Sequence, residues 1–168
     1  MEGEIINKVA NSSLININLE DYYEKGERVV FDVTPFLWQG LVVKEKDFRA
    51  ALKETDWSKY EDKLVAVSCS TDAIIPSWAF MLIAIELSEF AKKTVLGSLE
   101  DLEREIYIEA LSKLDCSIYK DKRVIVKGCS AYPVPEMAYL YLVQQLKPYT
   151  KSIMFGEACS TVPLFKKK

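Results

Sequence analysis

Three Cys-Ser pairs are the residues of this chain whose types and positions suit chemistry. They begin at Cys69, Cys129 and Cys159, and each follows a short run of residues with the character of a β-strand. Thiolates are soft ligands, and a set of three suits zinc or an iron–sulfur cluster. We therefore predict a metal or cluster site formed by these three cysteines, with the fourth cysteine, Cys116, lying elsewhere.

Three protein ligands leave one coordination position of such a metal open. The nearest carboxylates to the pairs in sequence are Asp72 and Glu157, and they are the candidates for that position. The serines of the pairs are interpreted first as helix caps and second as donors to an anion or a cluster sulfide. These serines are Ser70, Ser130 and Ser160.

Two other interpretations of the cysteines stand beside this one. Cysteine is small and commonly buried, so a Cys-Ser pair at a strand end also suits a structural role in a tight turn. Alternatively, the thiols carry sulfur or undergo redox chemistry. The chain has no CxxC pair, so local spacing provides no metal signature of its own.

The chain contains no histidine. This excludes Ser-His-Asp and Cys-His catalytic arrangements, and imidazole metal ligands, from within the chain. No residue is assigned a catalytic role, and whether the chain is an enzyme stays open. An enzyme acting on a polar small molecule would need Asp72 or Glu157 as its acid or base.

Composition narrows the classes of partner. The net charge is −3, and lysines cluster only in the last three residues, so we expect no nucleic-acid partner. The longest apolar stretch, Ala73 to Ile85, is too short to span a bilayer, so we expect no membrane association. The start of the sequence, MEGEIINKVA, is acidic and lacks the apolar region of a signal peptide. We therefore expect a cytoplasmic protein with reduced thiols.

An internal repeat organises the middle and end of the chain. A shift of 59 residues lays Asp56–Gly97 on Asp115–Gly156 without a gap, and 12 of the 42 paired positions are identical. The same shift places Ser70 on Cys129, so the cysteines of the two copies do not align. Agreement over the length of a β-α-β unit favours a true duplication.

Each copy has the pattern of a strand, a loop, a helix and a second strand. Lys63–Ser68 and Lys122–Lys127 are β-branched runs, and Pro76 and Pro135 suit the first turn of a helix. We predict a single α/β domain over residues 1–168, with a mostly parallel sheet and a duplicated β-α-β unit at 63–97 and 122–156. The Cys-Ser loops would then share the carboxyl edge of that sheet, where ligands bind.

The helices that follow the two prolines are apolar nearly all round, with charge only near their ends. Such helices are deeply buried or lie between subunits. One small domain does not easily surround two of them, so we predict a homodimer.

The chain resembles the domain of unknown function family 2480. The resemblance is carried by GERVVFDVTPFL, LVVKEKDFRAAL, CSTDAIIPSWA, DKRVIVKGCS with PVP, and SIMFGEACSTVPLFKKK, and it extends over essentially the whole chain. The family has no assigned activity. Its genes are associated with iron–sulfur assembly genes, which implies iron–sulfur assembly proteins as partners and favours a cluster over zinc.

Two functions follow as hypotheses. The first is an accessory factor of iron–sulfur or metal metabolism that holds a metal or cluster through Cys69, Cys129 and Cys159. The alternative is a non-catalytic α/β binding or scaffold module whose cysteines are structural.

Overall fold

The structure, a computed structural model, describes residues 14–128, 131–157 and 159–168. The chain forms two compact units, and one of them interrupts the other in sequence. We call Glu24–Glu105 the inserted unit, and Met1–Tyr23 together with Ile106–Lys168 the split unit. Within the described residues, no helix is long and apolar enough to cross a membrane.

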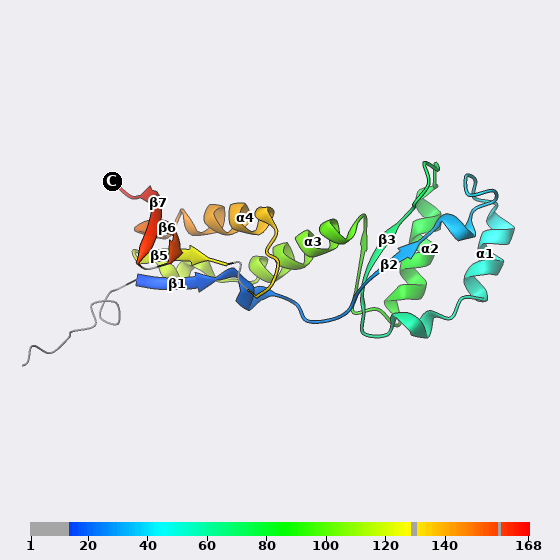
Figure 1. Ribbon diagram of the computed structural model, residues 1–168, viewed down its shortest axis with the longest axis horizontal. Helices are drawn as coiled ribbons and strands as arrows, with labels where there is room; N and C mark the ends of the chain where they lie inside the picture. Colours follow the sequence, from blue (N-terminus) through cyan, green and yellow to red (C-terminus); the bar gives the residue numbers. More distant parts are fainter. Residues whose placement is uncertain (1–13, 129–130, 158) are drawn as a thin grey trace, which may run out of the picture. The chain divides into compact units, whose positions relative to one another are not determined.

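The inserted unit is a three-stranded parallel sheet with helices packed on it (Figure 1). The strand order is β2-β3-β4. Its elements are β2 (Arg28–Asp32), η2 (Thr34–Phe36), α1 (Glu45–Lys53), η3 (Trp57–Tyr60), β3 (Leu64–Ser68), α2 (Ser77–Ser88), β4 (Lys93–Leu96) and the first half of α3 (Leu99–Ser112).

The split unit is a four-stranded sheet of order β1-β5-β6-β7, in which only β7 runs antiparallel. The second half of α3 belongs to this unit. Its other elements are β1 (Leu14–Asn18), η1 (Leu19–Tyr22), η4 (Cys116–Tyr119), β5 (Arg123–Lys127), α4 (Glu136–Leu146), β6 (Ser152–Glu157) and β7 (Ser160–Lys166).

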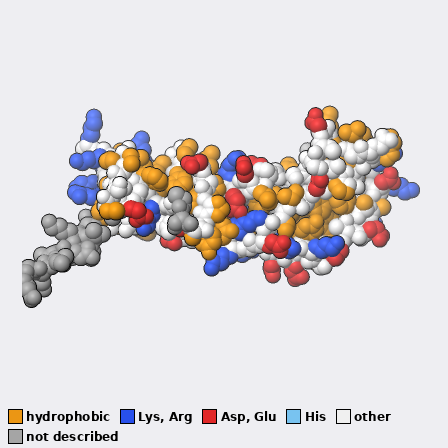
Figure 2. Space-filling view, viewed as in Figure 1, with side chains coloured by type: hydrophobic (Ala, Val, Ile, Leu, Met, Phe, Trp, Pro, Cys, Tyr) orange, Lys and Arg blue, Asp and Glu red, His pale blue; other side chains and the backbone are white. Residues whose placement is uncertain are grey.

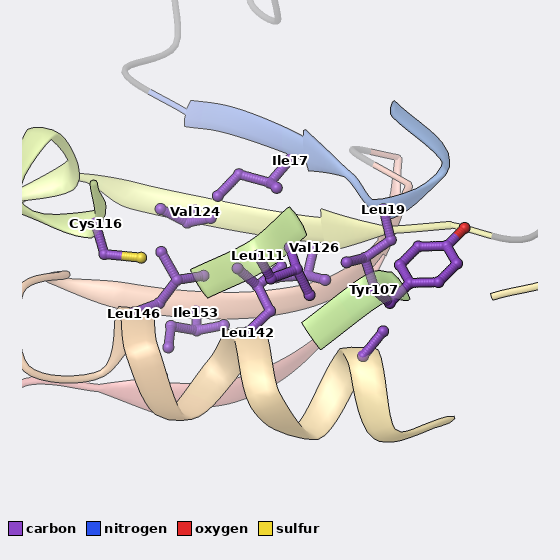
Figure 3. Close-up of a cluster of buried hydrophobic side chains, with 11 residues drawn as sticks. Ile17, Leu19, Tyr107, Leu111, Cys116, Val124, Val126, Leu142, Leu146 and Ile153 are labelled. Carbon is purple, nitrogen blue, oxygen red and sulfur yellow. The ribbon is translucent and has the colours of Figure 1, made fainter. Parts of the chain in front are cut away.

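Apolar residues at helical spacing form the core of each unit. In the inserted unit, Ala79, Ile83 and Leu87 recur every fourth residue along α2, so they share one face of the helix. In the split unit the same spacing brings Ala138, Leu142 and Leu146 of α4 onto the sheet. Figure 3 shows this second core, with Ile17, Val124, Val126 and Ile153 from the strands and Tyr107 and Leu111 from α3.

The predicted duplication is confirmed at the level of individual residues. Val65 pairs with neighbours on both sides in β3, and Val124, which is 59 residues later, occupies the same position in β5. Asp62 and Asp121 both adopt a left-handed φ of 57° before these strands. The three buried residues of α2 correspond, one by one, to those of α4.

The repeat is longer than the sequence comparison indicated. Phe48 and Leu52 of α1 correspond to Tyr107 and Leu111 of α3 at the same shift of 59. The strand preceding each copy is also repeated, because β2 pairs with β3 just as β1 pairs with β5. The sequence comparison used a shift of 59 residues. It could not detect this repeated strand, because β1 and β2 are only 14 residues apart.

The fold class is therefore α/β with mostly parallel sheets and a duplicated β-α-β unit, as predicted. The expectation that both copies lie in one sheet was wrong, because each copy pairs with its own preceding strand. That β1 and β2 each add to a different copy was not visible in local sequence pattern. A single domain over residues 1–168 stays a prediction.

Candidate functional site

The candidate site lies at the carboxyl ends of β2 and β3 in the inserted unit. Asp32 and Ser68 are the last, paired residues of these strands. Beyond them the Val33 N–H donates to the Ser68 carbonyl at 2.8 Å, so the two chains leave the sheet side by side. The next residues, Thr34 and Cys69, consequently meet at the edge where parallel sheets commonly bind ligands.

The Cys69 thiol lies between two hydroxyl groups. Its Sγ is 3.4 Å from Thr34 Oγ1 and 3.4 Å from Thr71 Oγ1, and the residue is half-buried. Partial burial raises the pKa of the Cys69 thiol, but hydrogen bonds from Thr34 and Thr71 outweigh it and hold that pKa below its usual value. The thiolate, which is the nucleophilic and metal-binding form of cysteine, therefore forms at a lower pH here than in an ordinary cysteine.

Asp32 organises the loop that carries this thiol. Its carboxylate accepts hydrogen bonds from the Thr34 N–H at 3.0 Å, the Ser70 N–H at 3.1 Å and the Ser70 hydroxyl at 2.7 Å. The Thr34 backbone bond and then the Ser70 hydroxyl lower the pKa of Asp32 to about 2. Asp32 is thus ionised at neutral pH and too weak a base to act as a general base there.

Ser70 belongs to this network and does not cap a helix. The N-cap of α2 is Pro76, and no side chain there bonds to the helix. Ser70 instead donates to Asp32 and lies 3.0 Å from Thr34 Oγ1. Its expected role as a helix cap was therefore wrong, because five residues separate Ser70 from Pro76, where the helix is capped.

A tight hairpin supports the site from the other side. The Thr71 hydroxyl donates to the Gly40 carbonyl at 2.6 Å. Trp38 and Val42 pair across a three-residue loop, and the Trp38 N–H donates to the Val42 carbonyl at 2.8 Å. Gln39 and Gly40 in this loop have left-handed φ angles of 54° and 69°. The turn therefore fixes Thr71, and Thr71 in turn contacts the sulfur.

The other predicted site residues are spread over the molecule. Cys129 and Ser130 lie outside the described residues. Cys159 is exposed in the turn between β6 and β7 of the split unit, and Cys116 is buried in the core of that unit, away from any such turn. Asp72 is exposed in the loop after Cys69.

The remaining two predicted residues lie in the β6–β7 hairpin. Ser160 is paired with Glu157 across the hairpin. The carboxylate of Glu157 lies 3.3 Å from the ammonium group of Lys127. Over residues 14–128, 131–157 and 159–168, no three Cys, Asp or Glu side chains gather in a way that could hold a metal ion. The three-cysteine site stays a prediction.

The equivalent edge of the split unit has the same backbone plan with different side chains. Asn18 accepts from the Glu20 N–H at 3.3 Å, as Asp32 accepts from Thr34. The Glu20 carboxylate accepts from the Ala131 N–H at 2.7 Å, and so holds the loop after β5. Gly128 takes the place of Cys69, and a Cβ there would lie 2.7 Å from Tyr139 Oη.

Sequence reasoning identified Cys69 but missed Thr34, Thr71 and Asp32. A signal did exist in the sequence, since a hydroxyl residue stands two positions after the end of each strand, Thr34 after β2 and Ser70 after β3. Only the pairing of β2 with β3 shows that the two loops meet.

What the site offers chemically is a half-buried thiol of lowered pKa, with two hydroxyl groups in contact and a fixed carboxylate nearby. Its thiolate form binds soft metals, and it can take the outer sulfur of a donor's persulfide, with release of the donor's thiolate.

The comparisons with known proteins place the chain in a family. No curated protein and no solved structure matches it. The family described as protein of unknown function, DUF2480, matches residues 3–167, which is nearly the whole chain. The chain, with its duplicated unit and its thiol at the end of β3, therefore belongs to the DUF2480 family.

Proposed function

We propose that this protein is an accessory factor of iron–sulfur or metal metabolism that holds its cargo, a soft metal ion or a sulfur atom, at the Cys69 thiolate. The observation that supports it is the pair of hydroxyl groups, from Thr34 and Thr71, each 3.4 Å from the sulfur. Burial raises the pKa of the Cys69 thiol, but hydrogen bonds from the Thr34 hydroxyl and from the Thr71 backbone outweigh it and lower that pKa. The thiol lies at the sheet edge where a ligand has access. Iron–sulfur assembly proteins are the proposed donors and acceptors of that cargo.

A resident metal does not fit the donors of the described residues. Near Cys69, the carboxylate of Asp32 already accepts three hydrogen bonds. A structural zinc site needs four ligands, and a catalytic one needs three. A single protein thiolate suits a cargo that keeps its other ligands from the donor. The version of the proposal with zinc or a cluster on Cys69, Cys129 and Cys159 is tested by the same variants.

The test is retention of cargo by protein purified without oxygen or chelators. Protein is incubated with Zn²⁺, or with ferrous iron and sulfide, desalted, and analysed for bound metal and sulfide. We expect Cys69→Ala to lose the bound metal, while Cys116→Ala, the matched control, keeps it. Loss in Cys129→Ala and Cys159→Ala as well would establish the three-cysteine version. Retention by Cys69→Ala equal to that of the unaltered protein would overturn the proposal.

A second candidate function is a binding module that self-associates, and one observation favours it. Met81 and Ile85 of α2 have exposed fractions of 64% and 63%, on the face opposite to the buried Ile83. Figure 2 shows hydrophobic side chains gathered at the surface over this part of the inserted unit. An exposed apolar helix face is typical of an interaction surface. Sedimentation velocity tests it, and a homodimer is the expected state.

A further inference from the structure

The internal repeat exposes a difference between the two sheets at equivalent strands. In the split unit, β6 pairs with β5 on one side and with β7 on the other. In the described part of the inserted unit, the equivalent strand β4 pairs with β3 and forms an edge of its sheet. The position that β7 occupies beside β6 thus has no counterpart beside β4 in the inserted unit.

The backbone of β4 is arranged to accept such a neighbour. The Gly97 N–H donates to the Val67 carbonyl at 2.9 Å, so residue 97 faces β3. Alternate residues of a strand direct their backbone groups to opposite sides, and those of Thr94 and Leu96 therefore face away from β3. In β6 the equivalent residues, Ile153 and Phe155, are the ones paired with Phe165 and Val162 of β7.

The side chains near this edge are also uncovered. Leu96 has an exposed fraction of 62%, against 38% for the equivalent Phe155 beside β7. Leu96 is in register with Val67 and Phe31 of the core under α1 and α2, so it lies on the same face of the sheet as α2. A strand added to β4 would therefore cover Leu96.

The charges beside β4 favour a second copy of the chain over a partner of one sign. A hollow of about 390 Å³ runs along the strand and is lined by it and by α3. The charged residues of its lining are Lys93, Arg104, Asp101 and Glu105, two of each sign. Arg104 and Asp101 already form an ion pair of 3.1 Å. A surface with both signs is complementary to its own copy, whereas an acidic or a basic peptide would meet repulsion on part of it.

We propose that β4 pairs antiparallel with β4 of a second copy about a two-fold axis, which joins the two inserted units through one continuous sheet. A two-fold axis requires the antiparallel direction, and this is the direction in which β7 pairs with β6. The proposal rests on the self-association put forward above and names the surface that produces it. Strand addition at a free edge is an established mode of protein recognition.

The experiment is sedimentation velocity of the full chain over a range of concentrations, with variants of Thr94. Thr94→Pro removes an N–H that faces the second copy and none that bonds to β3, and proline is tolerated on edge strands. Because of the two-fold axis, each substitution acts twice in the dimer, so we expect the dissociation constant to rise roughly tenfold or more. Thr94→Val keeps the N–H and is the matched control, with an unchanged dissociation constant.

Hydrogen exchange of the unaltered protein provides a second readout that does not depend on the folding of a variant. In the dimer the amides of Thr94 and Leu96 should exchange more slowly as protein concentration rises. Exchange at these amides that does not change with concentration would overturn the pairing. A dimer that Thr94→Pro leaves as tight as before would overturn the pairing while self-association stands. A monomer at every concentration would overturn both.

Discussion

The carboxyl ends of β3 and β5 carry different chemistry on the same backbone plan. At the end of β3, Cys69 lies against Thr34, and at the equivalent place after β5 the chain has Gly128, close to Leu19 and Tyr139. Both loops are held by residues at or just after the end of the neighbouring strand, Asp32 and Glu20. The core positions beneath them are matched from one unit to the other. Duplication thus preserves the scaffold while the loops at the sheet edge diverge.

The difference has a steric component. A Cβ at position 128 would lie 2.7 Å from the hydroxyl of Tyr139, and position 80, its equivalent in α2, is a phenylalanine without that oxygen. A side chain at position 128 would require Tyr139 to move. The scaffold therefore accommodates a thiol more readily at position 69 than at the equivalent position 128.

The largest expected effect tests whether the two cores are truly equivalent. Ile83→Ala and Leu142→Ala remove fully buried side chains at matched positions, and each should lower the free energy of unfolding by about 2–5 kcal/mol. Ile85→Ala, on the exposed face of α2, should change it by no more than about 0.5 kcal/mol. Urea unfolding followed by circular dichroism measures all three. A small effect at only one of the two buried positions would break the equivalence.

The next prediction concerns Cys69, whose equivalent position in the split unit is Gly128. Because hydrogen bonds from Thr34 and Thr71 lower the pKa of Cys69, its thiol should be alkylated by iodoacetamide at a lower pH than that of Cys116, whose pKa burial raises. Thr34→Val should raise the pH at which half of Cys69 is alkylated. The substitution removes one of the hydrogen bonds that offset the effect of burial on the pKa of Cys69. Thr34→Ser keeps a hydroxyl and is the control. Mass spectrometry of the alkylated peptides gives both midpoints, and equal midpoints for Cys69 and Cys116 would contradict the assignment.

A smaller effect is expected from Asp32→Asn. This substitution places at the end of β2 an asparagine, the residue type that ends β1. The pKa of Asp32 lies at about 2, below its usual value of 3.8. The ionised carboxylate therefore contributes stability that is fully present above about pH 4 and is lost as the pH falls through 2. The variant should be less stable than the unaltered protein at pH 7, and the two should converge near pH 2. Thermal unfolding across this pH range checks it, and a constant difference would count against the network around Ser70.

The smallest effect should come from Glu157. No acidic residue occupies the equivalent position in the inserted unit. Its ion pair with Lys127 is 3.3 Å long, and the Glu157 side chain is 67% exposed. Exposed pairs contribute about 0–1 kcal/mol, and salt screens them. Glu157→Gln should change the free energy of unfolding by less than about 1 kcal/mol, and by less still in 1 M salt. A larger loss would show that Glu157 has a structural role beyond this pair.

Local patterns in the sequence predicted the parts of the fold that depend on local physics. The β-branched runs around Val65 and Val124, and the prolines before the two apolar helices, were each placed correctly. The site was predicted in part. Cys69 was found because it follows a strand, but Thr34 is 35 positions earlier and is joined to it only by the pairing of β2 with β3. The division into two sheets has the same cause, since strand pairing is decided by contacts distant in sequence.

The interruption of one unit by the other has a consequence for the order of folding. The paired residues Leu14 and Arg123 are 109 positions apart, whereas Arg28 and Leu64 of the inserted unit are 36 apart. Closing a longer loop costs more chain entropy and slows folding. When the inserted unit folds first, the ion pair of Arg28 with Glu103 ties its two ends together and shortens the loop that β1 and β5 must close. Pulsed hydrogen exchange during refolding should accordingly protect β3 before β5, although the two strands occupy equivalent places in the repeat.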